Sequence, residues 1–382
     1  MTLNRRQLFR LTGASLGTAL VSAGSSAAFA EQPEFTAPTK QNPLLLSFNE
    51  NPLGMSQKAK EAIARAALYG SRYPFQQVVQ FKKDLAKFVG VTPDEVLLTH
   101  GSAEAIRATI EAYNLKNTVL VQPELTYGDG AMVAEHNGMP IKNVKMGPNW
   151  SVDLEALKKA AASEAKKHHI IVYLVNPNNP TSTIADCGFM IKWIKSQPKN
   201  TFFVLDEAYG EFVNDPSFKS GVELVKQGFD NLVVLKTFSK IFAMAGMRLG
   251  YAIGAVSVIN KIRDHVAYEV MMNQSTLAAA MAEMNDKEFL AESKESNDKA
   301  REILYKALDE LKIPYLPSQT NFVFIDLKAP LKPFFEHMKD ENIMVGRPFP
   351  PALQWCRISL GTPAEMTYFV EKLKEFRKKG WI

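Results

Sequence analysis

The chain has 382 residues, of which 46% are hydrophobic, 22% charged and 10% aromatic. This balance supports a large buried core and excludes a disordered or fibrous protein. The formal net charge is +5, but three arginines lie in the first 30 residues, which hold no acidic residue, so the remainder carries only +2. A near-neutral body gives no indication of nucleic-acid binding.

The first 30 residues have the pattern of an export signal. Arg5 and Arg6 open a basic segment, an apolar run rich in Gly, Ala and Ser follows, and Ala28-Phe29-Ala30 offers a small-residue cleavage site. Paired arginines favour the twin-arginine route, so we expect a periplasmic or otherwise exported protein. A general secretory signal is the alternative, because its opening is also basic. The glycines and serines in the run argue against an uncleaved membrane anchor.

The cysteine and histidine content predicts no metal site. Cys187 and Cys356 are the only cysteines and lie 169 positions apart, which excludes a paired-cysteine metal site and a disulfide-dense scaffold. We expect two buried thiols, with a single disulfide as the alternative. His168 and His169 are adjacent, so their side chains point in different directions and favour a helix-to-strand junction.

The body of the chain alternates helical patterns with short apolar runs. Residues 31–52 are expected to form an N-terminal arm, whose first part is polar and without periodicity. Helices are expected at 57–68, 75–88, 103–113, 153–167 and 189–196, and strands at 96–99, 118–122, 170–175, 202–206 and 232–236. Strands that are apolar on both faces and alternate with helices indicate an α/β protein with a mostly parallel, covered sheet. We assign residues 53–284 to this large domain.

The pattern changes after residue 284. A long polar helix over 287–311 is followed by an apolar run at 321–326, a helix at 333–342, a second run at 356–360 and a closing helix. This order predicts a smaller α+β domain at 285–382, packed against the first.

Three of the expected strands are followed by segments rich in chemically active side chains. The strand at 170–175 leads into Asn176-Pro177-Asn178-Asn179-Pro180-Thr181, the next into Asp206-Glu207-Ala208-Tyr209, and the third into Lys236-Thr237-Phe238-Ser239-Lys240, with Arg248 eight positions further on. Ligands of open parallel sheets bind at the carboxyl ends of the strands. These segments are therefore expected to form one site.

Together with Asn49-Glu50-Asn51-Pro52-Leu53-Gly54 and Arg357-Ile358-Ser359-Leu360-Gly361-Thr362, these motifs resemble those of the fold type I pyridoxal-phosphate aminotransferases of class I/II, and within them the histidinol-phosphate aminotransferase group. The motifs occur in the family's order over nearly the whole chain. The resemblance implies a seven-stranded, mostly parallel sheet in the large domain and a smaller C-terminal domain. It also implies pyridoxal 5′-phosphate as cofactor and a homodimer with shared active sites.

The resemblance implies a role for each residue around the cofactor ring. Lys240 would bind the cofactor covalently and move a proton as general acid and base. Asp206 would keep the ring nitrogen protonated, while Asn179 and Tyr209 would hydrogen-bond the ring hydroxyl oxygen. The structural alternatives are a helix cap for Asp206, a turn for Asn179 and a core position for Tyr209. Ser182 stands where the family usually has glycine, which changes the backbone freedom of the loop.

The cofactor phosphate needs convergent N–H donors and a positive charge. Ser102 and Ala103 open the helix after the first strand, at its positive end. The resemblance adds the hydroxyls of Thr237 and Ser239 and the guanidinium of Arg248. A plain N-cap for Ser102 and a surface ion pair for Arg248 are the alternatives.

Two tyrosines complete the implied cofactor site. Tyr127 matches the aromatic that stacks on the cofactor ring, although buried aromatics often serve only the core. Tyr73 matches a tyrosine that reaches the cofactor phosphate of the neighbouring subunit, and a tyrosine that shapes the turn before Pro74 is the alternative.

For the substrate, the resemblance implies Arg357, Arg347 and Asn51. Arg357 would bind a carboxylate through a two-pronged contact, and Arg347 would meet a donor phosphate. The segment before Arg347 is one residue longer than the usual pattern, and two extra prolines follow it. The amino donor therefore stays open between histidinol phosphate and an aromatic or other amino acid, with a 2-oxo acid such as 2-oxoglutarate as acceptor.

Other functions remain to be separated from transamination. A fold type I decarboxylase or lyase would share Asp206, Lys240 and Arg248, and a protein that binds the cofactor or an amine without turnover is a further alternative. The near-neutral charge and the export pattern count against a DNA-bound sensor. No Gly-x-Gly-x-x-Gly follows a strand in the body, which argues against dinucleotide binding.

Overall fold

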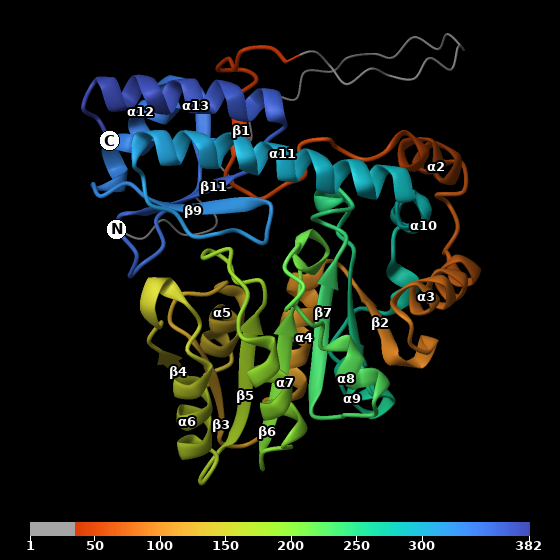
Figure 1. The fold of residues 1–382 in the computed structure, drawn as a ribbon. Helices are drawn as coiled ribbons and strands as arrows, with labels where there is room; N and C mark the ends of the chain where they lie inside the picture. The colour runs from red at the N-terminus through yellow and green to blue at the C-terminus, as the bar shows by residue number, and fades with distance from the viewer. Residues whose placement is uncertain (1–34) are drawn as a thin grey trace.

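A computed structural model describes residues 35–382. The predicted export signal lies outside the described residues. Figure 1 shows two parts, a large sheet covered by helices and a smaller part that contains α12 (Leu331–Asp340) and α13 (Pro363–Lys378) and is reached by the long helix α11 (Lys287–Leu311). No helix within residues 35–382 is long and apolar enough to cross a membrane.

The large part is built on one seven-stranded sheet. Its strands lie in the order β2 (Val96–Thr99), β8 (Gly250–Gly254), β7 (Leu232–Thr237), β6 (Thr201–Asp206), β5 (His169–Val175), β3 (Thr118–Pro123) and β4 (Ile141–Val144). Only β8 runs antiparallel to its neighbours, and the pairs from β7 to β4 are parallel. The mostly parallel seven-stranded sheet is therefore confirmed.

The apolar runs located five of the seven strands. The strand β4 reads Ile-Lys-Asn-Val and lies at the sheet edge with its two central residues exposed, so it lacks the continuous apolar character of a covered strand. The strand β8 begins and ends with glycine, a residue that weakens the strand signal.

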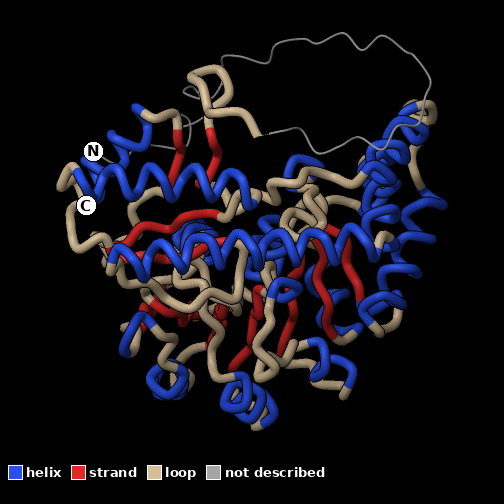
Figure 2. The backbone as a smooth tube through the Cα atoms, turned by 45° about the horizontal axis from the view of Figure 1, so that its top comes forward, coloured by secondary structure: helices blue, strands red, loops and turns tan. Residues whose placement is uncertain are grey.

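Helices cover both faces of this sheet, and Figure 2 shows the strands enclosed by them. One face packs against α4 (Ser102–Ala112), α5 (Asp129–His136) and α9 (Val256–Arg263). The other packs against α2 (Gln57–Ala67), α3 (Phe75–Val89), α6 (Leu154–Glu164), α7 (Cys187–Lys195), α8 (Val222–Lys226) and α10 (Gln274–Asn285). Successive strand residues point to opposite faces, so the two cores are filled by alternate residues of the same strands.

The smaller part joins the two ends of the described chain. The strand β9 (Phe322–Asp326) pairs antiparallel with β11 (Trp355–Ser359), and β1 (Leu44–Leu46) pairs in parallel with β10 (Ile343–Val345). Although β1 falls within the predicted arm, Leu44 and Leu46 are buried in the small core. Residues before the large sheet therefore help to build the part that follows it.

The helix α11 connects the two cores. Leu290, near its start, packs against the large core, whereas Ala300 and Leu304 are buried in the small one. Figure 1 shows the helix running from α10 across to the small part. Cys187 and Cys356 lie in different cores, buried and unpaired, which confirms the expectation of two buried thiols.

Candidate active site

Four segments far apart in the sequence meet at the carboxyl ends of β5 and β6. The Nη1 atom of Arg357, on β11, donates to Asn179 Oδ1 at 2.9 Å. The Tyr209 hydroxyl accepts hydrogen bonds from Asn179 Nδ2 at 3.4 Å and from Asn49 Nδ2 at 3.0 Å. The arm, both loops and the small part therefore share one centre.

Lys240 lies half-buried in this centre. Its Nζ donates to the main-chain oxygens of Phe48 and Asn49, both at 3.1 Å, and lies 5.7 Å from the centre of the Tyr209 ring. Burial, with the positive charge of Arg357, lowers the pKa of Lys240 to about 8. An amine with a lowered pKa is readily neutral, as a nucleophile or proton carrier must be.

The other lysine of the same segment has different surroundings. Lys236 Nζ lies 2.8 Å from Glu211 Oε1 and 3.5 Å from Glu207 Oε2. Burial lowers the pKa of Lys236, but the two carboxylates outweigh that effect and raise it. Lys240 forms no ion pair among residues 35–382. Of the two amines, only Lys240 is available for chemistry.

Asp206 ends β6 and is 2% exposed. Its Oδ1 accepts a hydrogen bond from Ala208 N at 3.1 Å and its Oδ2 accepts one from the Tyr173 hydroxyl at 3.2 Å. Burial raises the pKa of Asp206 to about 6, against the opposing effect of these hydrogen bonds. The contact with Ala208 is a turn contact and no helix cap, because the next helical turn begins at Gly210 with Tyr209 as its N-cap. Tyr173 ties the carboxylate to β5.

An anion-binding cup lies at the start of α4. The N-cap is Gly101, at φ +82°, so no side chain caps the N–H groups of Ser102 and Ala103. A Cβ atom at Gly101 would overlap the guanidinium of Arg248. Arg248 forms no ion pair within the described part of the chain, and its Nη1 donates to Ala245 O at 2.8 Å. A helix N-terminus beside an unpaired guanidinium is suited to a phosphate.

Gly250, on β8, allows a close approach between the start of α4 and the hydroxyls at the end of β7. It pairs with Thr99 on β2 and with Thr237 on β7, and a Cβ atom there would lie 2.5 Å from Ser102 N. The Thr237 hydroxyl donates to Ser239 Oγ at 3.0 Å and accepts from Ser239 N at 3.1 Å. The residues of the predicted phosphate site are therefore brought together.

Tyr127 lies half-buried at the edge of the core beside α5. Its hydroxyl donates to Asp129 Oδ2 at 2.9 Å. Burial and the charge of Asp129 raise the pKa of Tyr127, and Tyr209 and Asp206 also contribute. These electrostatic neighbours place the ring near the reactive centre rather than deep in the core.

The loop after β5 keeps a glycine-like backbone at Ser182. This serine has φ +62°, a conformation that glycine adopts more readily than other residues. The backbone is held by Ser182 N donating to Asn178 O and by Gln319 N donating to Ser182 O, both at 2.8 Å. The departure from the family pattern therefore leaves the loop in the left-handed conformation.

Two arginines approach one aromatic ring at the substrate end of the site. The guanidinium carbons of Arg357 and Arg347 lie 5.0 Å and 4.5 Å from the centre of the Phe349 ring. Arg357 is 9% exposed, donates to Ser47 O and has a buried Nε without a partner. Neither arginine forms an ion pair within residues 35–382, so the pair presents positive charge that an anionic ligand would neutralise.

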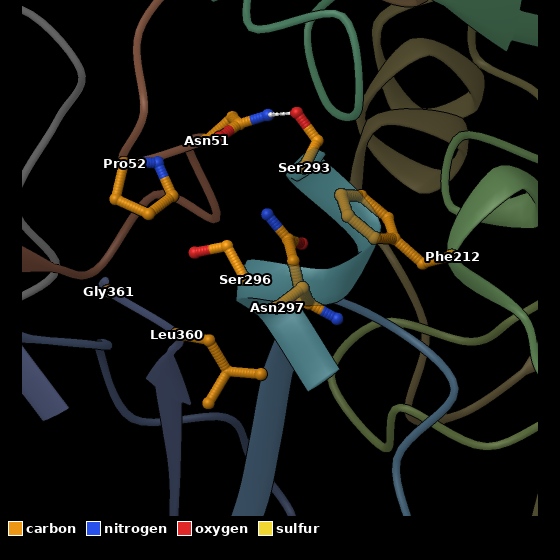
Figure 3. Close-up of a pocket in the computed structure, with 9 residues that line it drawn as sticks. Asn51, Pro52, Phe212, Ser293, Ser296, Asn297, Leu360 and Gly361 are labelled. Atoms are coloured by element: carbon orange, nitrogen blue, oxygen red, sulfur yellow. Dashed lines mark hydrogen bonds between the residues drawn. The ribbon is translucent and has the colours of Figure 1, made fainter. Parts of the chain in front are cut away.

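Two predicted residues lie apart from this cluster. Asn51 Nδ2 donates to Ser293 Oγ and to Ile241 O, both at 3.0 Å, and Figure 3 shows it turned toward Ser293. The cavity beside Asn51 measures about 10 Å³, room for about one water molecule. Tyr73 is 67% exposed and its ring faces Phe75.

Several site residues escaped the sequence interpretation. Asn49, at φ +55°, contacts the Tyr209 hydroxyl, Asn321 Nδ2 donates to Asn49 O at 2.9 Å, and Ser359 Oγ donates to Asn49 Oδ1 at 2.8 Å. Asn49 and Ser359 belong to the motifs that carried the resemblance, which was a usable signal. Tyr173 lies in an apolar run that predicts only a strand.

The donor set fits a defined kind of ligand. The cup is suited to a phosphate, Asp206 to a basic ring nitrogen, and Lys240 to an aldehyde carbon. Pyridoxal 5′-phosphate carries all three groups. Arg357, with its unpartnered Nε, adds a place for a second anion.

Comparison with known proteins decides the family. Residues 41–373 match the family described as aminotransferase class I and II. The chain belongs to this family. It is 32% identical to a histidinol-phosphate aminotransferase of Caldicellulosiruptor saccharolyticus over 334 residues, which is 86% of this chain and 90% of that one. For histidinol-phosphate aminotransferase 2 of Legionella pneumophila strain Lens the identity is also 32%, over 87% and 89% of the two chains.

Solved structures agree with this assignment. A crystal structure from Erwinia carotovora atroseptica SCRI1043, of a protein provisionally named a histidinol-phosphate aminotransferase, is 51% identical with a TM-score of 0.90 and covers 91% of this chain and 100% of that one. A histidinol-phosphate aminotransferase of Sinorhizobium meliloti, solved with pyridoxal-5′-phosphate, shares the fold at 23% identity and a TM-score of 0.82, over 93% and 99% of the chains.

The aminotransferase therefore uses pyridoxal 5′-phosphate and catalyses transamination, in the manner of the histidinol-phosphate aminotransferases. The fold alone would not separate transamination from decarboxylation, because an L-threonine-O-3-phosphate decarboxylase of Porphyromonas gingivalis shares it at 18% identity and a TM-score of 0.73. The family match makes that distinction.

The surroundings of Lys240 predict a pH-dependent stability of the cofactor-free protein. Its pKa is about 8 when folded and about 10.4 when unfolded. Between pH 8 and about 10.4 the unfolded state therefore binds more protons than the folded state, so the free energy of unfolding rises with pH in this range. Below pH 8 the cost of burying the charged amine is present in full. We expect Lys240→Met to be more stable than the wild type near pH 7, with the difference disappearing above about pH 10.5. Urea unfolding between pH 7 and 11 measures it.

The control is Lys236→Met, which leaves Glu207 buried without its lysine. This variant should be less stable than the wild type at neutral pH. A stability difference for Lys240→Met that stays constant with pH would contradict the assignment of the lowered pKa.

Proposed function

We propose that this aminotransferase moves an amino group from histidinol phosphate, or from an amino acid, to its cofactor and then to a 2-oxo acid such as 2-oxoglutarate. The observation that carries the proposal is the position of Lys240, an amine without an ion pair among residues 35–382 and with a lowered pKa, close to the charges of Arg357 and Asp206. The predicted roles of the individual residues are part of the proposal.

The cofactor supplies an electron sink for the bond that breaks at the substrate carbon. Lys240 binds the cofactor covalently and carries the proton that moves during the reaction. Asp206 holds the ring nitrogen in its protonated form. Asn179 and Tyr209 fix the ring hydroxyl oxygen, which is supported by their hydrogen bond to each other and by the hydrogen bond from Arg357 to Asn179.

The phosphate is held by the cup at the start of α4. The backbone N–H groups of Ser102 and Ala103 and the hydroxyls of Thr237 and Ser239 donate hydrogen bonds to the phosphate. Arg248 supplies the positive charge. The support for this arrangement is the unpaired state of Arg248 within residues 35–382 and its position over Gly101. The donors lie at the start of α4, at the end of β7 and just before β8, so the sheet holds them in place for the phosphate.

Arg357 and Arg347 bind different substrates of the reaction. Arg357, which is almost buried, binds the carboxylate of the 2-oxo acid, because a planar guanidinium matches a carboxylate through two hydrogen bonds. Arg347 is exposed at the mouth of the site and binds the phosphate of histidinol phosphate. The names of the relatives support this donor.

The identity of the amino donor is tested by the first half of the reaction, in which the amino group passes to the cofactor. We expect histidinol phosphate, added without any 2-oxo acid, to remove the visible band of the lysine-bound cofactor faster than phenylalanine, tyrosine or aspartate does. Lys240→Ala should abolish both the band and the turnover. Arg347→Gln should raise the KM for histidinol phosphate about tenfold or more while leaving the KM for 2-oxoglutarate unchanged, because one charge-assisted contact is lost.

Arg357→Gln is the matched comparison and should raise the KM for 2-oxoglutarate. Loss of the band with an amino acid only would replace histidinol phosphate by that amino acid as donor. Retained turnover in Lys240→Ala would overturn the proposed catalytic role.

A homodimer is the second part of the proposal. Large apolar side chains are exposed around the α2–α3 connection, namely Leu68, Tyr69, Tyr73, Phe75 and Val79, each more than half exposed. Clustered apolar exposure of this kind marks protein–protein contact sites. In the dimer, Tyr73 reaches the cofactor phosphate of the neighbouring subunit.

The dimer is tested by light scattering after size-exclusion chromatography. We expect twice the chain mass for the wild type and a monomer with at least tenfold less turnover for Leu68→Glu/Phe75→Glu, because two charges would be buried in the interface. Leu115→Glu, at an exposed leucine after α4, should remain dimeric. A wild type that runs as a monomer with full activity would contradict the shared site.

Export by the twin-arginine route is the third part. It is supported by the order of basic, apolar and small residues in the first 30 positions. In a bacterial host, the chain should reach the periplasm with its N-terminus at Glu31. Arg5→Lys/Arg6→Lys should keep it in the cytoplasm at full length, as cell fractionation and mass measurement would show. Unchanged export of that variant would indicate the general secretory route instead.

A further inference from the structure

One buried carboxylate near the site has no role in the scheme above. Asp129 is the first residue of α5, lies between Gly128 and Gly130, and is 8% exposed. Its Oδ2 accepts the Tyr127 hydroxyl hydrogen bond at 2.9 Å. The N-terminal end of a helix carries partial positive charge, so an acidic side chain is favourably placed here.

The contact of Asp129 differs from those made by other aspartates at helix starts. Asp153, before α6, accepts from Ala156 N at 2.8 Å, and Asp186, before α7, accepts from Phe189 N at 2.9 Å. Each of these carboxylates caps its own helix. Asp129 instead reaches back to the aromatic ring of the loop that precedes its helix.

The start of α5 also touches the residue that holds Asp206. A Cβ atom at Gly130 would lie 2.7 Å from Cδ1 of Tyr173, so the absence of a side chain there lets the ring lie against the helix. The Tyr173 hydroxyl donates to Asp206 Oδ2 at 3.2 Å. The groups that act electrostatically on Tyr127 are Asp129, Tyr209 and Asp206, so Asp129 faces the same buried cluster.

We propose that Asp129 is a positioning residue that fixes the plane of the Tyr127 ring by accepting its hydroxyl hydrogen. The inference rests on the proposed function, in which Tyr127 covers one face of the cofactor ring. Tyr127 is only half-buried, so packing alone leaves its ring freer than a core aromatic. A hydrogen bond to an ionised acceptor is shorter and stronger than a neutral one and supplies the missing constraint.

The charge of Asp129 adds a second effect in the same direction. It lies in a buried region, where charge interactions are screened less than at the surface. Its negative charge raises the pKa of Asp206, because two like charges disfavour each other. A positively charged ring nitrogen beside the two carboxylates would relieve that repulsion. Both effects hold the cofactor more tightly and neither requires contact between Asp129 and the substrate.

The test is a double-mutant cycle read out as the dissociation constant of pyridoxal 5′-phosphate. Tyr127→Phe keeps the ring and removes the hydroxyl, and Asp129→Ala removes the acceptor. We expect each change to weaken binding about tenfold, as for the loss of a hydrogen bond to a charged group. The double variant should bind no worse than the weaker single variant, since both remove the same contact.

A second variant of Asp129 separates the loss of the hydrogen bond from a general effect on folding. Asp129→Asn retains an acceptor oxygen, and we expect it to bind the cofactor within about threefold of the wild type if the hydrogen bond dominates. Asp153→Ala is the control for a helix-start carboxylate, and should lower the melting temperature while leaving the cofactor dissociation constant unchanged.

Additive effects in the double variant would overturn the inference, because they would show that the two side chains act separately. Unchanged binding in Asp129→Ala, together with weakened binding in Tyr127→Ala, would also overturn it and leave the proposed function intact. Unchanged binding in Tyr127→Ala would show that the ring does not cover the cofactor and would reject both.

Discussion

The active site depends on one hydroxyl group that three distant segments share. The Tyr209 hydroxyl, at the end of the central strand β6, is contacted by Asn49 of the arm and Asn179 of the β5 loop, and Asn179 in turn binds Arg357 of the small part. Because β1 and β11 both belong to the small part, these contacts hold its core against the carboxyl edge of the sheet. Polar residues from both parts consequently meet at this edge of the sheet.

A surplus of positive charge over negative charge suits the active site to anionic ligands. Lys240, Arg248, Arg347 and Arg357 form no ion pairs within the described residues, whereas the neighbouring Lys236 is neutralised by two glutamates. Asp206 and Asp129 are the buried carboxylates of this region. A doubly charged phosphate and a substrate carboxylate would supply negative charge, which explains why the same site suits both the cofactor and a 2-oxo acid.

Much of the fold and part of the site could be predicted, because they follow from patterns of neighbouring residues in the sequence. Apolar runs revealed β2, β3, β5, β6 and β7, and the residues after three of them included Asn179, Asp206 and Lys240. The edge strand β4 and the glycine-bounded β8 lacked such runs. Asn51 was expected to bind substrate, but its hydrogen bonds go to Ser293 and Ile241, contacts that cross more than 180 residues and leave no local trace.

The sequence by itself determined the class of chemistry, since motifs such as Asp206 to Tyr209 and Thr237 to Lys240 are contiguous and their residue types follow from the reaction. Only the tertiary structure decided which lysine is free to react, which asparagine meets Tyr209, and how Asp129 comes to hold Tyr127. The physical reason is that a pKa or a hydrogen bond depends on burial and on neighbours from other segments. Lys236 and Lys240 are four positions apart in one motif and differ only in what the folded chain places around them.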